Sequence, residues 1–200
     1  MLLRDGITLR KVVGGGGGYI RLARNPFTGD VYLLNPVNGL YRVELAVPGS
    51  TLQVVAMSDI ITDGAASGMA FGPDAVQYRG DDGHQHDVAA EGKPLYTFTP
   101  HRSPLGLVFT TDARMPADLR GDSGSLSAFV LSWGAAGGSF SDQGQDLLHL
   151  RLAKRGEDYE SVTTQIARRF KNPIDAVMIE NRLYVLEYGA DGAIWELTFE

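Results

Sequence analysis

The densest group of possible metal ligands lies between Gly80 and Asp87, where the sequence reads Gly-Asp-Asp-Gly-His-Gln-His-Asp. Residues two apart on a β-strand point to the same side of a sheet, so His84 and His86 would share one face. Two imidazoles with a carboxylate, here that of Asp87, can bind a divalent metal. The same residue types also favour solvated hairpin turns. The sequence therefore leaves open a metal site at these residues or a polar turn.

The best candidate for acid–base chemistry is His101, which is followed by Arg102 and an apolar segment. An imidazole titrates near neutral pH and can act as a general acid or base. The guanidinium of Arg102 can hold a carboxylate or phosphate through two parallel hydrogen bonds. Alternatively, Arg102 is structural and bonds to backbone carbonyls. We predict His101 as the catalytic residue and Arg102 as a ligand-binding residue.

Two further residues can contact a ligand. Trp133 stands beside a glycine-rich stretch, 134–144, and its amphipathic ring can either stack on a sugar or pack between sheets. Asp175 stands near a junction between a strand and a turn, where a carboxylate can bind calcium or accept hydrogen bonds within the turn.

Composition excludes several functions. The net charge of −6 predicts no binding to nucleic acid or to an anionic membrane surface. The absence of cysteine excludes disulfides, thiolate metal sites and a cysteine nucleophile. No apolar run approaches the roughly 18 residues of a membrane span. The first residues do not resemble a signal peptide, and the compartment stays open.

Short segments in which apolar and polar residues alternate recur along the chain and are separated by turn residues. This pattern predicts β-strands. The clearest are 19–22, 31–34, 40–45, 174–179, 183–187 and 193–199. Further candidates are 8–13, 52–57, 68–71, 76–79, 86–89, 95–99, 105–110, 126–131, 147–152 and 161–170, the last of which also admits a helical turn.

These segments fall into about four groups of about four strands, a spacing typical of β-propeller blades. The blade-like units are approximately 7–46, 51–90, 94–152 and 160–199. One thin sheet cannot bury both of its faces, and stacking around a common axis supplies the missing core. We therefore predict one all-β domain, a propeller of about four four-stranded blades, in which the last strand pairs near the first. An incomplete ring would need partner chains, as in a homo-oligomer, to cover its ends.

Three parts of the chain combine strand and turn residues in a recognisable order. They are SGMAFGPD at 67–74; SPLGLVF at 103–109, with Met-Pro at 115–116 and Ser-Leu at 125–126; and NPIDAV at 172–177, with LYV at 183–185 and GAIW at 192–195. Together they resemble the soluble quinoprotein glucose dehydrogenase and sorbosone dehydrogenase family of β-propellers. That family usually has six blades, so the chain looks like a shortened or fragmentary relative.

The resemblance implies a periplasmic or secreted sugar or aldose dehydrogenase that uses pyrroloquinoline quinone and calcium. It also implies a sugar-like ligand, with Asn172 and Asp175 in the closing blade as ligand-binding candidates. In the family a histidine base precedes the Gly-Pro-Asp turn, and arginines near the closing blade hold the quinone. Here 63–67 contains no histidine, and neither Asn172 nor Ile174 is basic. The alternative is a non-catalytic propeller that binds a small ligand or a protein.

Overall fold

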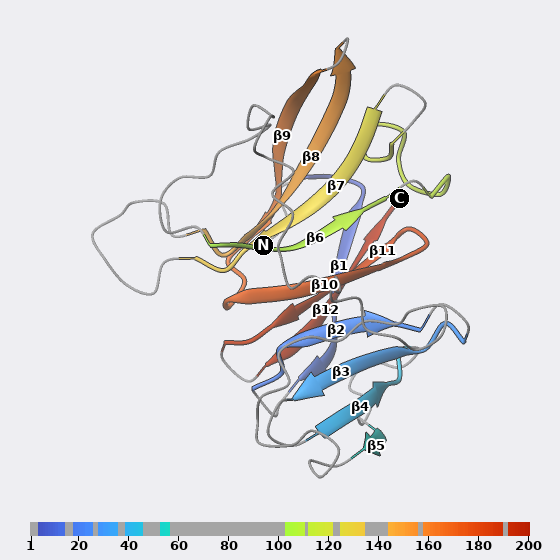
Figure 1. Cartoon of the computed structure of the whole chain (residues 1–200), viewed down its shortest axis with the longest axis vertical. Coiled ribbons are helices and arrows are strands. Elements are labelled where there is room, and N and C mark those ends of the chain that lie inside the picture. Colours follow the sequence, from blue (N-terminus) through green and yellow to red (C-terminus); the bar gives the residue numbers. More distant parts are fainter. Residues whose placement is uncertain are drawn as a thin grey trace, which may run out of the picture.

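A computed structural model of the chain describes residues 4–14, 18–25, 28–35, 39–45, 53–56, 103–110, 112–121, 125–134, 144–155, 158–189 and 192–200. These residues form twelve β-strands in three four-stranded antiparallel sheets, and none of them is helical, which confirms the predicted all-β class for this part of the chain (Figure 1). Within the same ranges there is no helix long and apolar enough to cross a membrane. The strands expected at 68–71, 76–79, 86–89 and 95–99 lie outside the described residues.

The first sheet follows the chain order. It contains β2 (Arg21–Arg24), β3 (Val31–Asn35), β4 (Gly39–Val43) and β5 (Gln53–Ala56), each hydrogen-bonded to the next. Val31 pairs with Val43, and Leu33 lies two residues further along β3. All three side chains are buried, because residues two apart on a strand face the same side of the sheet.

The second sheet also follows the chain order. It contains β6 (Pro104–Phe109), β7 (Ser125–Ser132), β8 (Asp146–Arg155) and β9 (Asp158–Arg168). The helical alternative for part of 161–170 is wrong, because β9 pairs with β8 along its whole length. Val162, Thr163 and Thr164 are β-branched residues, which favour a strand. β9 therefore lies with β8 rather than with the C-terminal strands, where the sequence grouping had put it.

The third sheet joins the two ends of the chain. Its order is β1–β12–β11–β10, formed by β1 (Ile7–Gly14), β10 (Pro173–Ile179), β11 (Arg182–Glu187) and β12 (Ala193–Phe199). Ile7 pairs with Phe199 and Gly14 with Ala193, so the expected pairing between the first and last strands is present. β1 consequently lies with the C-terminal strands and not with 19–45. A local apolar pattern predicts a strand but does not specify its partner.

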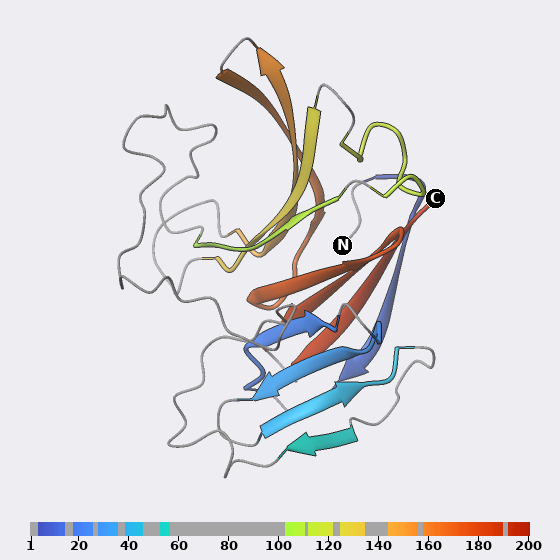
Figure 2. The same cartoon turned by 45° about the vertical axis from the view of Figure 1, so that its right-hand side comes forward.

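The third sheet lies between the other two (Figures 1 and 2). One core cluster, including Phe129, Leu147 and Phe199, joins it to the second sheet, and another, including Val31, Leu33 and Leu186, joins it to the first. β10 contacts both β2 and β6.

The contact between β6 and β10 requires a glycine at position 106. Gly106 has a φ of 56°, and a Cβ atom there would lie 3.3 Å from the Cα of Asp175. A larger residue would meet both a strained backbone and the opposing strand.

Candidate functional site

The structure describes three of the predicted site residues. Trp133, Asn172 and Asp175 lie within it, whereas His84, His86, Asp87, His101 and Arg102 lie outside the described residues. The metal site and the catalytic histidine therefore stay predictions.

Trp133 and Asn172, which the sequence named separately, are neighbours. Trp133 follows β7 and Asn172 precedes β10, and the side-chain amide of Asn172 donates a hydrogen bond from Nδ2 to the Trp133 carbonyl at 3.2 Å. Tyr188, which follows β11, packs its ring against that of Trp133, with the ring centroids 5.2 Å apart and the planes inclined at 44°. We call Trp133, Asn172 and Tyr188 the aromatic rim. Trp133 is partly buried, and Tyr188 is 42% exposed.

Backbone conformation positions the aromatic rim. Asn172 has a φ of 52°, a left-handed conformation that asparagine tolerates better than most residues. Its carbonyl accepts the N–H of Tyr188 at 3.0 Å, and the N–H of Trp133 donates to the Ser103 carbonyl at 3.0 Å. A Cβ on Gly189 would lie 2.8 Å from both the Asn172 Oδ1 and the Lys171 carbonyl, so this turn requires a glycine. The sequence did not single out Tyr188.

Asp175 makes a structural contact between sheets. Its Oδ2 accepts the N–H of Leu22 on β2 at 2.9 Å, and its Oδ1 accepts the N–H of Ala176 at 3.0 Å. Burial raises the pKa of this carboxyl, and the two backbone hydrogen bonds oppose that rise. The side chain thus joins β10 to β2, and its role in ligand binding stays a prediction.

A serine and a histidine that the sequence analysis did not select lie in contact on β7 and β8. Ser127 Oγ is 2.7 Å from His149 Nε2, and both residues are buried, at 1% and 3% exposure. The Ser127 hydroxyl donates to the Leu119 carbonyl at 2.7 Å. Its single proton is therefore used, and His149 must donate from Nε2 to Ser127 Oγ.

This pair is unsuited to nucleophilic catalysis. A catalytic histidine accepts the proton of the serine, whereas His149 donates one to it. Burial lowers the pKa of His149 to about 4, so the ring is neutral at physiological pH. Its ring also packs on Phe129, with centroids 5.2 Å apart. Ser127 and His149 therefore form a buried structural pair.

A second cluster of polar side chains lies beside the first sheet. It links β1, near the N-terminus, to β11 and β12, near the C-terminus. Arg10 donates from Nε to Glu196 Oε1 at 3.1 Å and from Nη2 to Oε2 at 2.7 Å, and Tyr184 donates its hydroxyl to Oε2 at 2.7 Å. Burial opposes ionisation of Glu196, but the hydrogen bonds from Arg10 and Tyr184 outweigh it and lower its pKa. Burial, with the bond to Glu196, raises the pKa of Tyr184 to about 12, so its hydroxyl stays a donor.

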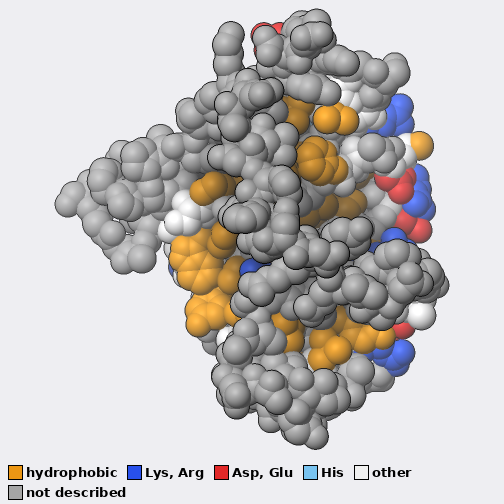
Figure 3. All heavy atoms as spheres, in the orientation of Figure 1, with side chains coloured by type: hydrophobic (Ala, Val, Ile, Leu, Met, Phe, Trp, Pro, Cys, Tyr) orange, Lys and Arg blue, Asp and Glu red, His pale blue; other side chains and the backbone are white. Residues whose placement is uncertain are grey.

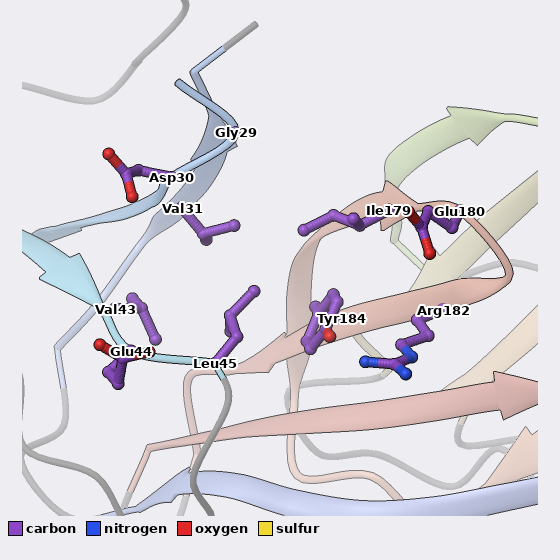
Figure 4. Close-up of a pocket in the computed structure, with 10 residues that line it drawn as sticks. All are labelled: Gly29, Asp30, Val31, Val43, Glu44, Leu45, Ile179, Glu180, Arg182 and Tyr184. Carbon is purple, nitrogen blue, oxygen red and sulfur yellow. The ribbon is translucent and has the colours of Figure 1, made fainter. Parts of the chain in front are cut away.

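A pocket with a volume of about 370 Å³ lies beside this group, between the first sheet and the turn that connects β10 to β11 (Figure 4). Tyr184 and Gly29 line part of it. Its other walls combine four apolar side chains, Val31, Val43, Leu45 and Ile179, with four charged ones, Asp30, Glu44, Glu180 and Arg182. The pocket and the aromatic rim lie at opposite ends of β10 and β11.

The quinone and calcium that the resemblance implies stay predictions, and the described residues give no support for them. Among these residues there is no group of three or more histidine and carboxylate side chains that could hold a metal ion. At the start of β10, Asn172 uses its side-chain amide on the Trp133 carbonyl, and Ile174 is apolar. No cationic side chain stands at those two positions to hold the quinone carboxylates.

Comparisons with known proteins give distant structural matches. No protein-family model matches the sequence, and no curated protein does so. A protein from Thermus thermophilus that bears the name oxidoreductase (glucose dehydrogenase) is 18% identical, with a TM-score of 0.34, over 93% of this chain and 46% of that one. Two glucose dehydrogenases are also 18% identical, over 92% of this chain, with TM-scores of 0.34 and 0.36. The chain spans less than half the length of each of these proteins.

Proposed function

We propose that this chain is a β-propeller protein that binds a sugar-like molecule at the aromatic rim. Each described sheet has four antiparallel strands, as a propeller blade does. β2, β6 and β10 stand at one edge of their sheets, and β10 contacts the other two strands, which supports placing these three strands nearest a common axis. The pairing of β1 with β12 joins the two ends of the chain, as ring closure needs.

The rim itself carries the proposal for sugar binding. Trp133 and Tyr188 come from different sheets and pack together at the same end of both. Ligand sites typically combine aromatic surface with a few fixed polar groups. An aromatic face packs on the C–H face of a sugar ring. The Asn172 side chain, held by its hydrogen bond to the Trp133 carbonyl, is the fixed polar group beside the rings.

The chain's two tryptophans provide a direct test. Trp195 is partly buried, with Lys11 Nζ 6.0 Å from its ring centroid, and does not belong to the rim. A Trp195→Phe variant therefore leaves Trp133 as the only indole. We expect its fluorescence to change and saturate during titration with at least one member of a panel of aldoses.

Two variants control this titration. Tyr188→Ala in the Trp195→Phe background removes the ring that packs on Trp133 and should weaken sugar binding about tenfold or more. Tyr32→Ala, on β3, removes an aromatic side chain outside the rim and should leave the affinity unchanged. If no sugar changes the emission of Trp133, or if both variants behave alike, sugar binding at the rim is wrong.

Sugar oxidation is tested on the same protein. Pyrroloquinoline quinone and calcium are added, and the quinone absorbance and the reduction of a dye are recorded with each sugar. Because no histidine stands at 63–67 and neither Asn172 nor Ile174 is basic, we expect no dye reduction. Cofactor uptake with turnover would instead support the dehydrogenase and assign its base to residues outside the described part, with His101 the first candidate.

A further inference from the structure

The pocket between the first sheet and the β10–β11 turn has one basic side chain in its wall, and that side chain reaches into it. Figure 4 shows the guanidinium of Arg182 extending toward the cavity beside Tyr184. The carboxylates of Asp30 and Glu44 point away from the cavity in the same view. Each follows or precedes a valine whose side chain faces the cavity, and neighbouring residues on a strand face opposite sides. Of these three charges, that of Arg182 is therefore the one placed to meet a ligand.

Two acidic side chains of the wall already have basic partners. Arg42 Nη1 lies 3.9 Å from Asp30 Oδ2, and Arg114 Nη1 lies 2.8 Å from Glu180 Oε1. Basic and acidic side chains accordingly lie next to one another along the right-hand edge in Figure 3, the side to which the β10–β11 turn projects in Figure 1. Arg182, by contrast, forms no ion pair with any carboxylate in the part of the chain that the structure describes. Its charge is left for a ligand.

The guanidinium of Arg182 has a polar neighbour in the wall. Burial, with the bond to Glu196, raises the pKa of Tyr184, and a hydrogen bond with Arg182 opposes that rise. The guanidinium therefore lies at the Tyr184 hydroxyl. Because a guanidinium carries five N–H donors, one bond to a hydroxyl leaves a pair of donors for a carboxylate.

The pocket also offers apolar surface to a ligand. Leu45 and Ile179 are only partly buried, whereas Val31 and Val43 are buried. Val31 and Ile179 point toward one another from opposite walls (Figure 4). A hydrocarbon group placed between these walls would leave water, which favours binding in proportion to the area buried.

Hydrogen bonds fix Leu45 and Tyr184, which approach each other across the pocket in Figure 4. Arg10 Nη2 donates to the Leu45 carbonyl at 3.4 Å and to Glu196 Oε2 at 2.7 Å. The Tyr184 hydroxyl donates to the same carboxylate oxygen at 2.7 Å. Both walls are therefore tied to the Arg10–Glu196 ion pair, and a wall fixed before binding loses little entropy when a ligand enters.

We propose that this pocket binds a small organic anion, a carboxylate carried on a short hydrocarbon chain or ring. Arg182 pairs with the carboxylate through two parallel N–H···O bonds, and Leu45 and Ile179 pack on the hydrocarbon. The pocket volume of about 370 Å³ lies in the lower part of the range for small-molecule sites, about 300–1,000 Å³. The site lies at the far end of β10 and β11 from the aromatic rim and does not depend on sugar binding there.

Calorimetric titration with three probes of equal chain length, hexanoate, hexanol and hexylamine, tests the proposal. The net charge of −6 would by itself favour hexylamine, so a preference for hexanoate reports a local site. We expect hexanoate to bind about tenfold or more tightly than hexylamine, with hexanol between them, and added salt to reduce this difference by screening. Equal affinities, tighter binding of hexylamine, or no binding of hexanoate would overturn the proposal.

Variants then locate the binding site. Arg182→Gln should weaken hexanoate binding about tenfold and hexanol binding much less, because only the carboxylate loses a charged partner. Leu45→Ala should weaken both probes alike, and Arg168→Gln, on β9, should leave both affinities unchanged. Circular dichroism checks that each variant is folded. Tyr188→Ala should retain full hexanoate affinity, because it alters only the rim. Equal losses of hexanoate binding in Arg182→Gln and Arg168→Gln would show a general effect of protein charge and would contradict a site in this pocket.

Discussion

Arg10 and Glu196 stand 186 residues apart in the sequence and form a two-point ion pair across β1 and β12. Glu196 is only 6% exposed, and its other strong donor is the hydroxyl of Tyr184. The pair therefore joins the ends of the chain at the place where the N-terminal strand enters the C-terminal sheet.

Replacing Arg10 by alanine should lower the free energy of unfolding by about 2 kcal/mol, because a buried carboxylate then loses its charged partner. Chemical denaturation measures this change. Arg4→Ala is the matched control: Arg4 bonds to Asp118 at 2.8 Å, but that carboxylate is 61% exposed, and the expected cost is under about 1 kcal/mol. Equal effects of the two substitutions would contradict a specific role for the Arg10–Glu196 pair.

His149 should make stability fall in acid. Its pKa is about 4 in the folded protein and near 6.5 when it is unfolded, so the unfolded chain binds a proton first as pH falls. The free energy of unfolding that neutral His149 contributes is fully present above pH 6.5. It is lost as the pH falls from 6.5 to 4, by up to about 3 kcal/mol.

Denaturation at a series of pH values, with His149→Gln for comparison, measures this dependence. The variant should lose less stability than the original protein over the same interval. An NMR titration in which His149 ionises near 6.5 in the folded protein would show that the imidazole is not buried as described.

Ser127→Ala should destabilise the protein by about 2 kcal/mol, because it leaves two buried groups without a partner, the Leu119 carbonyl and the His149 Nε2–H. Ser161→Ala, on the partly exposed β9, provides a control with the same change of side chain and a smaller expected loss. The loss at Ser127 should persist at pH 8, where His149 is neutral in both states. A loss that appears only in acid would mean that the proton arrangement inferred here is wrong.

Gly106→Ala should lower the free energy of unfolding by more than backbone strain alone accounts for. Gly106 and Gly29 both have positive φ, 56° and 79°, so alanine is strained at either position. At Gly29 the nearest atom to a new Cβ is 3.5 Å away, on the flexible Arg24 side chain, and the expected loss is about 1 kcal/mol. At Gly106 the Cβ would also press on Leu131 and the β10 backbone, adding about 1–2 kcal/mol. Thermal or chemical denaturation of both variants should show this order, and equal losses would contradict the close contact of β6 with β10.

Sequence patterns located most of the described strands. The predicted segments 174–179, 183–187 and 193–199 are strands at 173–179, 182–187 and 193–199. The prediction succeeded because alternating apolar residues and turn residues act locally, over a few positions. The same patterns could not reveal that β9 pairs with β8, since its polar, β-branched sequence fits any exposed sheet edge.

Site residues were harder to predict than strands. Trp133 and Asn172 were selected one at a time, for what each side chain can do, and nothing in the sequence placed them in contact. Ser127 and His149 carried no signal, because each occupies an ordinary position in an alternating strand. Their proximity depends on the register between β7 and β8, in which Phe129 stands opposite His149.

By itself, the amino-acid sequence determined the all-β class, the turns and the approximate extent of most described strands, because those properties depend on residues close together in the chain. Tertiary structure alone decided that β1 completes the C-terminal sheet, that Trp133, Asn172 and Tyr188 form one rim, and that a pocket opens at the other end of β10 and β11. These arrangements follow from pairing and packing between distant segments, and a periodic local pattern is compatible with many partners.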